Sequence, residues 1–354
     1  MNRLFSFQLI LVILGVLGVI EYKYYRKSKI LILIGIIITS SLFFTTNFSV
    51  PDFIMYEDIY NFKINYTGIE KIYIGLGQIF KKIGFSFYIF RIIVGIVTTL
   101  LLYRGFYKIT FLPNLTMFYY MGYQFLEKPY IQIRNALSIA IFINVLVFFI
   151  QRKFLKSFIG IIVSSLFHIS SYFYFITYFF SKIKFNAKRI KLYFMFFSIG
   201  GILLYYINFI EVLRLLGNMN LGRISERINM YFFSEAGKIH IRSSEIGIRV
   251  IINYFLFFIY TLRMLELEKR KDINLNKEKY IFYFLGVVSL FRMLSYKIGI
   301  FTRVIGNFDF AEVIALVFLI KSIKSKKNKV LYFFITYLYI IVLNYKVGKD
   351  LGLW

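Results

Sequence analysis

A few polar residues in an otherwise apolar chain could act on a charged substrate. Arg134 and Arg303 each lie at the edge of a long hydrophobic run, where a charge near hydrocarbon is costly and usually functional. An arginine presents a planar fork that binds phosphate oxygens through two hydrogen bonds, and it keeps its charge at physiological pH. Glu70 and His168 can exchange protons near neutrality and could deprotonate a hydroxyl. These residue types together suit a phosphate-bearing substrate.

The composition is that of a polytopic membrane protein. Of the 354 residues, 59% are hydrophobic, and the mean hydropathy is +0.69, whereas a soluble domain keeps more charge on its surface. A net charge of +27 would suggest a nucleic-acid binder in a soluble protein. In a membrane protein, lysine and arginine in cytoplasmic loops explain this charge, so we expect no nucleic-acid partner. The chain has no cysteine, which excludes disulfides and thiolate chemistry.

Ten apolar runs are each about long enough to cross a bilayer. They cover residues 4–20, 30–46, 84–103, 111–126, 131–150, 190–209, 246–263, 280–297, 303–320 and 330–346. No soluble domain separates them, so residues 1–354 are predicted to form a single transmembrane domain. The expected fold is all-α, a polytopic integral membrane protein with about 10–12 transmembrane helices, some of them broken or re-entrant.

The segment from Phe154 to Phe180 does not fit simple alternation, because it has basic residues at both ends. A helix of this length measures roughly 40 Å, whereas two complete crossings need about 60 Å. We therefore expect two short helices that meet within the membrane, with the sequence "HISS" from His168 at the bend. Broken backbone at that depth is tolerated only where it is buried in protein or lines a watery cavity.

Charge predicts the orientation of the spans. Lysine and arginine concentrate in short loops, which the positive-inside rule places in the cytoplasm; these loops cover residues 21–29, 104–108, 152–156, 182–191, 263–279 and 321–329. The predicted outer loops then cover approximately residues 47–71 and 210–245. Glu70, Tyr73, Arg134 and Arg303 reach the outer leaflet in this topology. His168 lines a cavity that opens outward.

Each of these residues also has a plainer interpretation. Arg134 could extend from a helix end to lipid headgroups, and Arg303 could be a headgroup anchor. His168 could be a helix-breaking residue bonded to a carbonyl. Glu70 could be a solvated loop charge.

Other charges suggest two additional features. Arg292 is predicted to form an ion pair with Asp309 and Glu312 inside the membrane, and the alternative is a proton or substrate pathway. The segment 211–245 could lie on the membrane as an amphipathic lid. Its Arg223 and Arg227 could meet an acidic glycan or a diphosphate, and the alternative is solvated charge.

Four short motifs occur in a characteristic order: Glu70 with Tyr73, "IRNALS" from Ile133, "FHIS" from Phe167 and "TRVIGNF" around Arg303. In this order and spacing the chain resembles the EpsG-type branch of the Wzy-like bacterial polysaccharide polymerases. The resemblance extends from about Asp52 to Phe308. The chain departs from the family pattern at Asn135, where the family commonly has glutamine.

The resemblance implies a metal-independent membrane glycosyltransferase without a cofactor, similar in fold to the C-type glycosyltransferases that use lipid-linked sugars. Such an enzyme joins undecaprenyl-diphosphate-linked oligosaccharide units into an exopolysaccharide, capsule or O-antigen at the outer face of the bacterial cytoplasmic (inner) membrane. Glu70 and His168 are the expected catalytic residues. The expected substrate-binding residues are Arg134, Arg303, Tyr73, Asn135, Arg223 and Arg227. Membrane lipids, a chain-length regulator and a flippase of the same pathway are further expected partners.

Two other functions stay open. A membrane O-acyltransferase that modifies a glycan would also use a histidine within the membrane. A flippase or exporter for lipid-linked oligosaccharide should show inverted repeats between its halves, and the sequence shows none.

Overall fold

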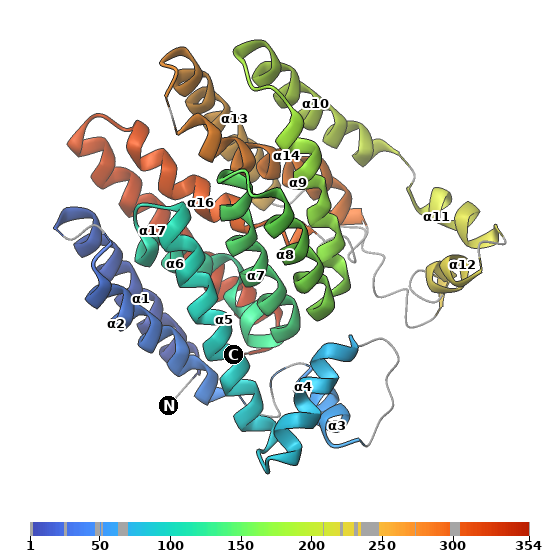
Figure 1. Ribbon diagram of the computed structural model, residues 1–354. Helices are drawn as coiled ribbons and strands as arrows, with labels where there is room; N and C mark the ends of the chain where they lie inside the picture. The colour runs from blue at the N-terminus through green and yellow to red at the C-terminus, as the bar shows by residue number, and fades with distance from the viewer. Residues whose placement is uncertain are drawn as a thin grey trace. The chain divides into compact units, whose positions relative to one another are not determined.

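The computed structural model describes residues 3–24, 27–46, 50, 52–62, 70–207, 209–219, 222–229, 233–234, 248–272, 274–297 and 305–353. Every regular element in these ranges is a helix and none is a strand (Figure 1), which confirms the predicted all-α class. The chain packs as two compact units, residues 1–182 with 316–354 (unit 1) and residues 183–315 (unit 2).

The helices of unit 1 follow the predicted apolar runs. They are α1 (Arg3–Lys23), α2 (Lys29–Ser41), η1 (Leu42–Thr45), α3 (Phe53–Tyr60), α4 (Lys71–Lys82), α5 (Phe87–Ile109), α6 (Pro113–Tyr120), η2 (Met121–Ile131), α7 (Ile133–Ile150), α8 (Phe154–Phe167), η3 (Ile169–Phe175), α9 (Ile176–Lys182), η6 (Ile320–Ser322) and α17 (Lys326–Asp350). The predicted outer loop at 47–71 therefore contains a helix, α3.

Five helices in the described part are long and apolar enough to span a membrane: α1, α5, α7, α13 (Ile248–Lys269) and α17. The remaining runs lie in helices that are shorter or interrupted, in a pair of helices joined by a bend of 72° (Ala187–Tyr206 with Ile210–Asn218), or in a helix that is long enough but less apolar (Leu275–Lys297). For example, the run 30–46 is split between α2 and η1, and α6 continues into the π-helix η2. The protein thus has several membrane spans, and the total of about 10–12 stays a prediction.

Helix α7 forms the core of unit 1, where it packs between α5 and α8 (Figure 1). Gly105 of α5 faces Ile143, and Gly160 of α8 faces Val145, so closely that an added Cβ would clash with the α7 side chain. Small residues at such crossings let the backbones approach, as is common where lipid offers no hydrophobic driving force. Arg134 and His168 belong to this closely packed group of helices.

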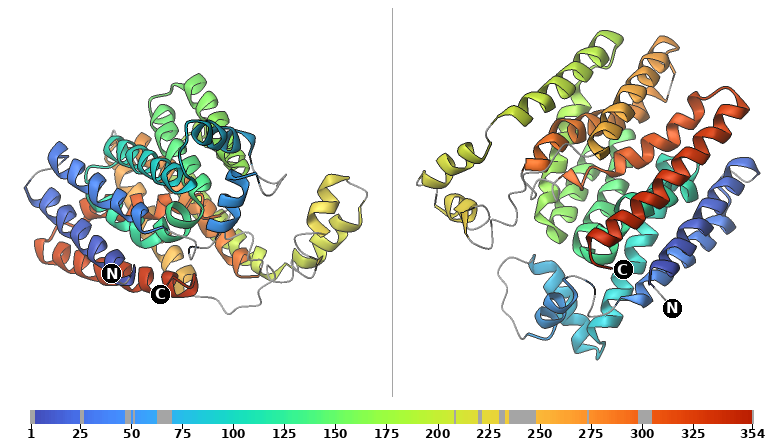
Figure 2. Two further views of the ribbon diagram at one scale, coloured as in Figure 1. Left: turned by 90° about the horizontal axis from the view of Figure 1, so that it is seen from below. Right: turned by 180° about the vertical axis from the view of Figure 1, so that it is seen from behind.

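Helices α1 and α17 run antiparallel along unit 1 (Figure 2). Near the start of α1, Gln8 Nε2 donates to Asn344 Oδ1 at 3.2 Å, and near its end Tyr22 contacts the ring of Phe333 at 5.2 Å. Asn344 Nδ2 also donates to the carbonyl of Met121 in η2 at 3.2 Å. α17 thereby joins α1 to η2 and closes the unit.

Unit 2 contains α10 (Ala187–Tyr206), α11 (Phe209–Asn218), α12 (Arg223–Ile228), α13, α14 (Leu275–Lys297) and the start of α16 (Phe310–Leu319). α10, α13 and α14 pack against one another. Arg263 of α13 donates from Nε and Nη2 to the two carboxylate oxygens of Glu278 in α14, each at 2.6 Å. Bidentate pairs of this kind fix geometry as well as charge.

Candidate functional site

The helix break predicted at His168 is present. α8 ends at Phe167, and His168 has extended backbone with φ −156° and ψ 119°. The chain then turns back beside α8, because the Tyr178 hydroxyl donates to the carbonyl of Phe154 at 2.6 Å and the rings of Phe158 and Phe175 lie 5.5 Å apart. The segment is therefore a helical hairpin whose two ends lie together, as its basic ends predicted. The depth of this hairpin in a membrane stays a prediction.

Serine hydroxyls attach the hairpin to α7. Ser138 Oγ lies 3.0 Å from Ser164 Oγ in α8 and also contacts Ser171 Oγ in η3, and Ser164 Oγ donates to the carbonyl of Ser138 at 2.9 Å. All three side chains are fully buried. Ser138 follows Arg134 by one helical turn, so the same face of α7 holds the hairpin and presents the arginine. The distance between His168 and Arg134 is fixed in this way.

Replacing Ser138 with alanine is expected to lower the free energy of unfolding by about 1–3 kcal/mol, because Ser164 and Ser171 lose a buried hydrogen-bond partner. Denaturation of the purified protein in detergent measures the change. Ser41→Ala is the control, because Ser41 is exposed and bonds only within its own helix; its effect should stay within about 0.5 kcal/mol. Equal effects of the two substitutions would contradict the role of the serine cluster.

Glu70 brings Arg134 and His168 together. One carboxylate oxygen, Oε2, accepts a hydrogen bond from Arg134 Nη1. The other, Oε1, accepts from the backbone N–H of Ile169 at 2.9 Å and lies 3.2 Å from His168 Nδ1. The side chains of Arg134, Glu70 and His168 are 11%, 14% and 25% exposed, so His168 is the member that solvent reaches most easily. Three residues far apart in sequence thus form one contact group, which we name the Glu70 cluster.

The surroundings of Glu70 keep it ionised. Burial raises the pKa of this carboxyl, but the contacts with His168, Arg134 and the Ile169 N–H together outweigh burial and hold the pKa below its ordinary value. A carboxylate of lowered pKa is a weak base, so Glu70 is better suited to orienting a neighbour than to taking a proton. If neutral His168 carries its proton on Nδ1, the nitrogen nearest to Glu70 Oε1, Nε2 is able to accept a proton.

Two tyrosines flank the Arg134 guanidinium. Arg134 Nε donates to the Tyr56 hydroxyl at 3.2 Å, and the guanidinium lies 5.1 Å and 5.8 Å from the ring centres of Tyr56 and Tyr73. Tyr73 was predicted as a site residue, whereas Tyr56 was missed. Its signal is the spacing of Phe53, Tyr56 and Tyr60, which places three aromatic rings on one face of α3.

The Glu70 cluster and the basic loops lie at opposite ends of unit 1. The cluster is at the start of α7. The start of the neighbouring α5 lies at the same end, because Arg91 of α5 donates to the carbonyl of Tyr130, three residues before α7. At the other end of α5, Lys27 Nζ donates to the carbonyl of Tyr107 at 2.6 Å, and Lys321 lies over the ring of Phe111. α5 has 23 residues, so the two ends are separated by roughly 35 Å, about the thickness of a bilayer core.

The structure places the other predicted site residues less fully. Asn135 is buried, and its Nδ2 donates to Gln132 Oε1 at 3.4 Å. Arg223 and Arg227 lie in α12, but their side chains are not among the described ones. Arg303 lies outside the described residues. The roles of these four residues stay predictions, and so does the lid formed by the segment 211–245.

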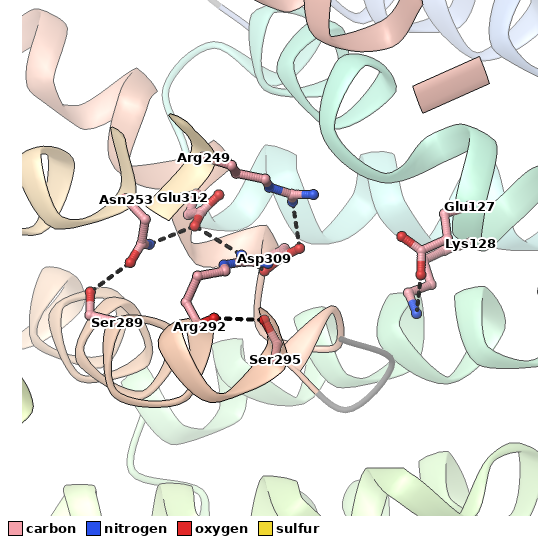
Figure 3. A network of polar contacts seen from close by, with 9 residues as sticks. All are labelled: Glu127, Lys128, Arg249, Asn253, Ser289, Arg292, Ser295, Asp309 and Glu312. Atoms are coloured by element: carbon pink, nitrogen blue, oxygen red, sulfur yellow. Dashed lines mark hydrogen bonds and ion pairs between the residues drawn. The ribbon is translucent and has the colours of Figure 1, made fainter. Parts of the chain in front are cut away.

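A second polar cluster is buried in unit 2 (Figure 3). Arg292 Nη2 contacts Asp309 Oδ1 and lies 3.1 Å from Glu312 Oε1. Arg249 Nη2 lies 2.7 Å from Asp309 Oδ2, and Asn253 Nδ2 donates to Glu312 Oε1 at 2.6 Å. The predicted ion pair of Arg292 with both acids is confirmed. Two arginines and two carboxylates balance in charge, which favours the structural interpretation over a pathway.

A metal site is not apparent: in the described ranges, no group of three or more His, Cys, Asp or Glu side chains could hold a metal ion. The predicted metal independence is not tested by this observation and stays a prediction.

A family model matches a range of the chain that spans the Glu70 cluster. The family model of the EpsG family matches residues 45–351, a range that includes Glu70, Arg134 and His168. No curated protein and no solved structure matches the chain. Because the family model covers most of the sequence, the chain belongs to the EpsG family.

Proposed function

We propose that this protein polymerises oligosaccharide units carried on a lipid diphosphate, undecaprenyl diphosphate in bacteria, and that it does so at the outer face of the cytoplasmic membrane. Membership of the EpsG family suggests a polysaccharide polymerase. The observation that carries the finer proposal is the Glu70 cluster, in which a cation, an ionised carboxylate and a partly exposed histidine lie in contact.

The proposed reaction is a glycosyl transfer. The hydroxyl oxygen of the acceptor unit forms a bond to the anomeric carbon of the donor sugar, and the bond from that carbon to the diphosphate oxygen breaks. His168 takes the hydroxyl proton at Nε2, while Glu70 fixes the ring through Nδ1; a carboxylate orients a histidine base in hydrolase triads in the same manner. The diphosphate leaves with the bonding electrons.

Arg134 is proposed to stabilise the leaving diphosphate. A fixed guanidinium aimed at developing negative charge lowers the barrier without reorganising at the moment of reaction. The flanking tyrosines hold the guanidinium plane, because Tyr56 accepts from Nε and both rings lie beside it. Arginine can fill this role in place of a metal because it offers two donors and a permanent charge.

The proposed sidedness rests on charge. The Glu70 cluster lies at the end of α5 opposite to Lys27 and Lys321, and lysine-rich loops stay in the cytoplasm in most membrane proteins. The cluster would therefore face outward, where repeat units are joined once the lipid carrier has crossed the bilayer.

Reconstitution tests the proposal. The purified full chain in liposomes is incubated with one defined undecaprenyl-diphosphate oligosaccharide, and a ladder of products on a gel with release of undecaprenyl diphosphate is the expected result. A folded protein that leaves the lipid-linked sugar intact would refute the proposal. Transfer of acyl groups to a glycan in the same preparation would favour the O-acyltransferase instead.

A further inference from the structure

Arg91 is buried with most of its hydrogen-bonding capacity unused. It lies near the start of α5 and has none of its surface exposed. Nη2 donates to the carbonyl of Tyr130. Nε and Nη1 have no hydrogen-bond partner among the described residues. A buried donor without a partner is costly, and a charged one more so.

The charge of Arg91 is also uncompensated within unit 1. Every Asp and Glu side chain of that unit lies in the described part of the chain, and none of them forms an ion pair with Arg91. Asp52 is within electrostatic range but is exposed to solvent. By contrast, the other buried arginines with described side chains each contact a carboxylate; these are Arg134, Arg263 and Arg292.

Arg91 shares its aromatic surroundings with the Glu70 cluster. The Phe53 ring centre lies 5.4 Å from its guanidinium. Tyr56 and Tyr73, which flank Arg134, are within electrostatic range of Arg91 as well. The Tyr73 hydroxyl is buried and has no hydrogen-bond partner among the described residues. Unused donors of Arg91 and Tyr73 therefore occur next to the proposed site.

We infer that Arg91 and the Tyr73 hydroxyl bind a second phosphate group of the lipid diphosphate, next to the one at Arg134. This inference rests on the proposed function, since it extends the same site. The charge of Arg134 is balanced by Glu70, so Arg91 supplies the net positive charge that holds a polyanion. Phe53 of α3 lies across Arg91, so α3 must shift for the phosphate to enter.

The competing explanation is structural: Arg91 would only hold the carbonyl of Tyr130 at the end of η2. The two explanations differ in the sign of a stability change. If Arg91 is only a support, its removal weakens the ligand-free protein. If Arg91 instead binds an anion, its removal takes away an unpaired buried charge. The ligand-free protein is then as stable as before or more stable, while its affinity for the anion falls.

Binding of inorganic pyrophosphate to the full chain in phosphatidylcholine nanodiscs distinguishes them. Phosphatidylcholine has no net charge and does not compete for the site. Arg91→Gln should bind pyrophosphate at least about tenfold more weakly than the unchanged protein, because two charge-assisted hydrogen bonds are lost, with no fall in ligand-free melting temperature. Arg104→Gln is the matched control, being exposed near the other end of α5; its affinity should not change. Unchanged affinity in Arg91→Gln, or no pyrophosphate binding by the unchanged protein, overturns the inference.

Tyr73→Phe decides the matter if Arg91→Gln does not fold. The substitution removes only a hydroxyl without a partner, so the ligand-free protein should be at least as stable as before. Pyrophosphate affinity should fall about three- to tenfold, and an unchanged affinity would overturn the inference. The ladder assay separates this inference from the proposed function. If the unchanged protein makes a ladder but both variants bind pyrophosphate as it does, the inference about Arg91 is wrong and the proposed polymerase function stands. If the unchanged protein makes no ladder, the proposed polymerase function is wrong, whatever the result for anion binding.

Discussion

Polymerisation by the reconstituted protein is expected to fall by at least about 100-fold when Arg134 is replaced with alanine, the size of effect seen when a fixed donor to a developing anion is removed. The substitution removes the cation that we propose stabilises the leaving diphosphate. It also leaves Glu70 without one of its hydrogen-bond donors, so the carboxylate keeps the Ile169 N–H but orients His168 less strictly. The rate at which the gel ladder grows measures the change.

Two further variants interpret that result. Arg104→Ala, exposed on α5, should give a normal ladder and so controls for expression and reconstitution. Arg134→Lys keeps the charge but lacks the planar fork, so its rate should lie between those of alanine and arginine. A normal ladder from a correctly inserted Arg134→Ala protein would remove Arg134 from the site, and with it the mechanism drawn from the Glu70 cluster.

Replacing Arg292 with methionine should destabilise the protein by about 3–5 kcal/mol, because Asp309 and Glu312 would stay buried without the cation that contacts both. Arg249 still pairs with Asp309, but the hydrogen-bond donor that Glu312 keeps among the described residues is the uncharged amide of Asn253. The loss is a large part of the stability of a typical protein. It appears as a lower midpoint of chemical denaturation in detergent.

The control for this substitution is Arg270→Met. Arg270 also pairs with a carboxylate, Glu266, at 2.6 Å, but the two side chains are 60% and 43% exposed. A surface pair contributes about 0–1 kcal/mol, so this variant should behave nearly as the unchanged protein. If both variants lost stability equally, burial would not be what makes the Arg292 cluster important.

The elements of the fold could largely be read from the sequence, because hydrophobic run length and charge are local properties. In the described part of the chain, each of the ten predicted runs lies mostly in helix, and the basic ends of the segment 154–182 correctly indicated a hairpin. Element interruptions were less predictable. The π-helix η2 contains Pro129, and its first residue, Met121, accepts a hydrogen bond from Asn344, more than 200 residues away in the sequence. Such distant contacts are not visible in the local sequence.

The site was predictable in part for a similar reason. Arg134, Glu70 and His168 stood out as polar residues in apolar or loop segments, and their contacts fit that prediction, although their roles await the experiments above. Arg91 was missed even though it is a charge inside a span, which is a signal in itself. No sequence pattern predicts that Arg91 lacks a carboxylate partner, because this depends on how α3, α4 and η2 pack around α5.

Unit 1 is built from two separate stretches of the chain, and this determines the order in which it can assemble. Residues 1–182 form most of this unit, yet α17, from a segment made more than 140 residues later, completes it through Asn344 and the close approach of Ile340 to Gly122. While the ribosome is still translating the intervening 133 residues, Ile183–Ala315, α1 and η2 lack the contacts that α17 makes with them. Unit 1 can therefore be completed only after α17 has been made, so a chain that ends before α17 leaves Gly122 and the Met121 carbonyl of η2 without their contacts.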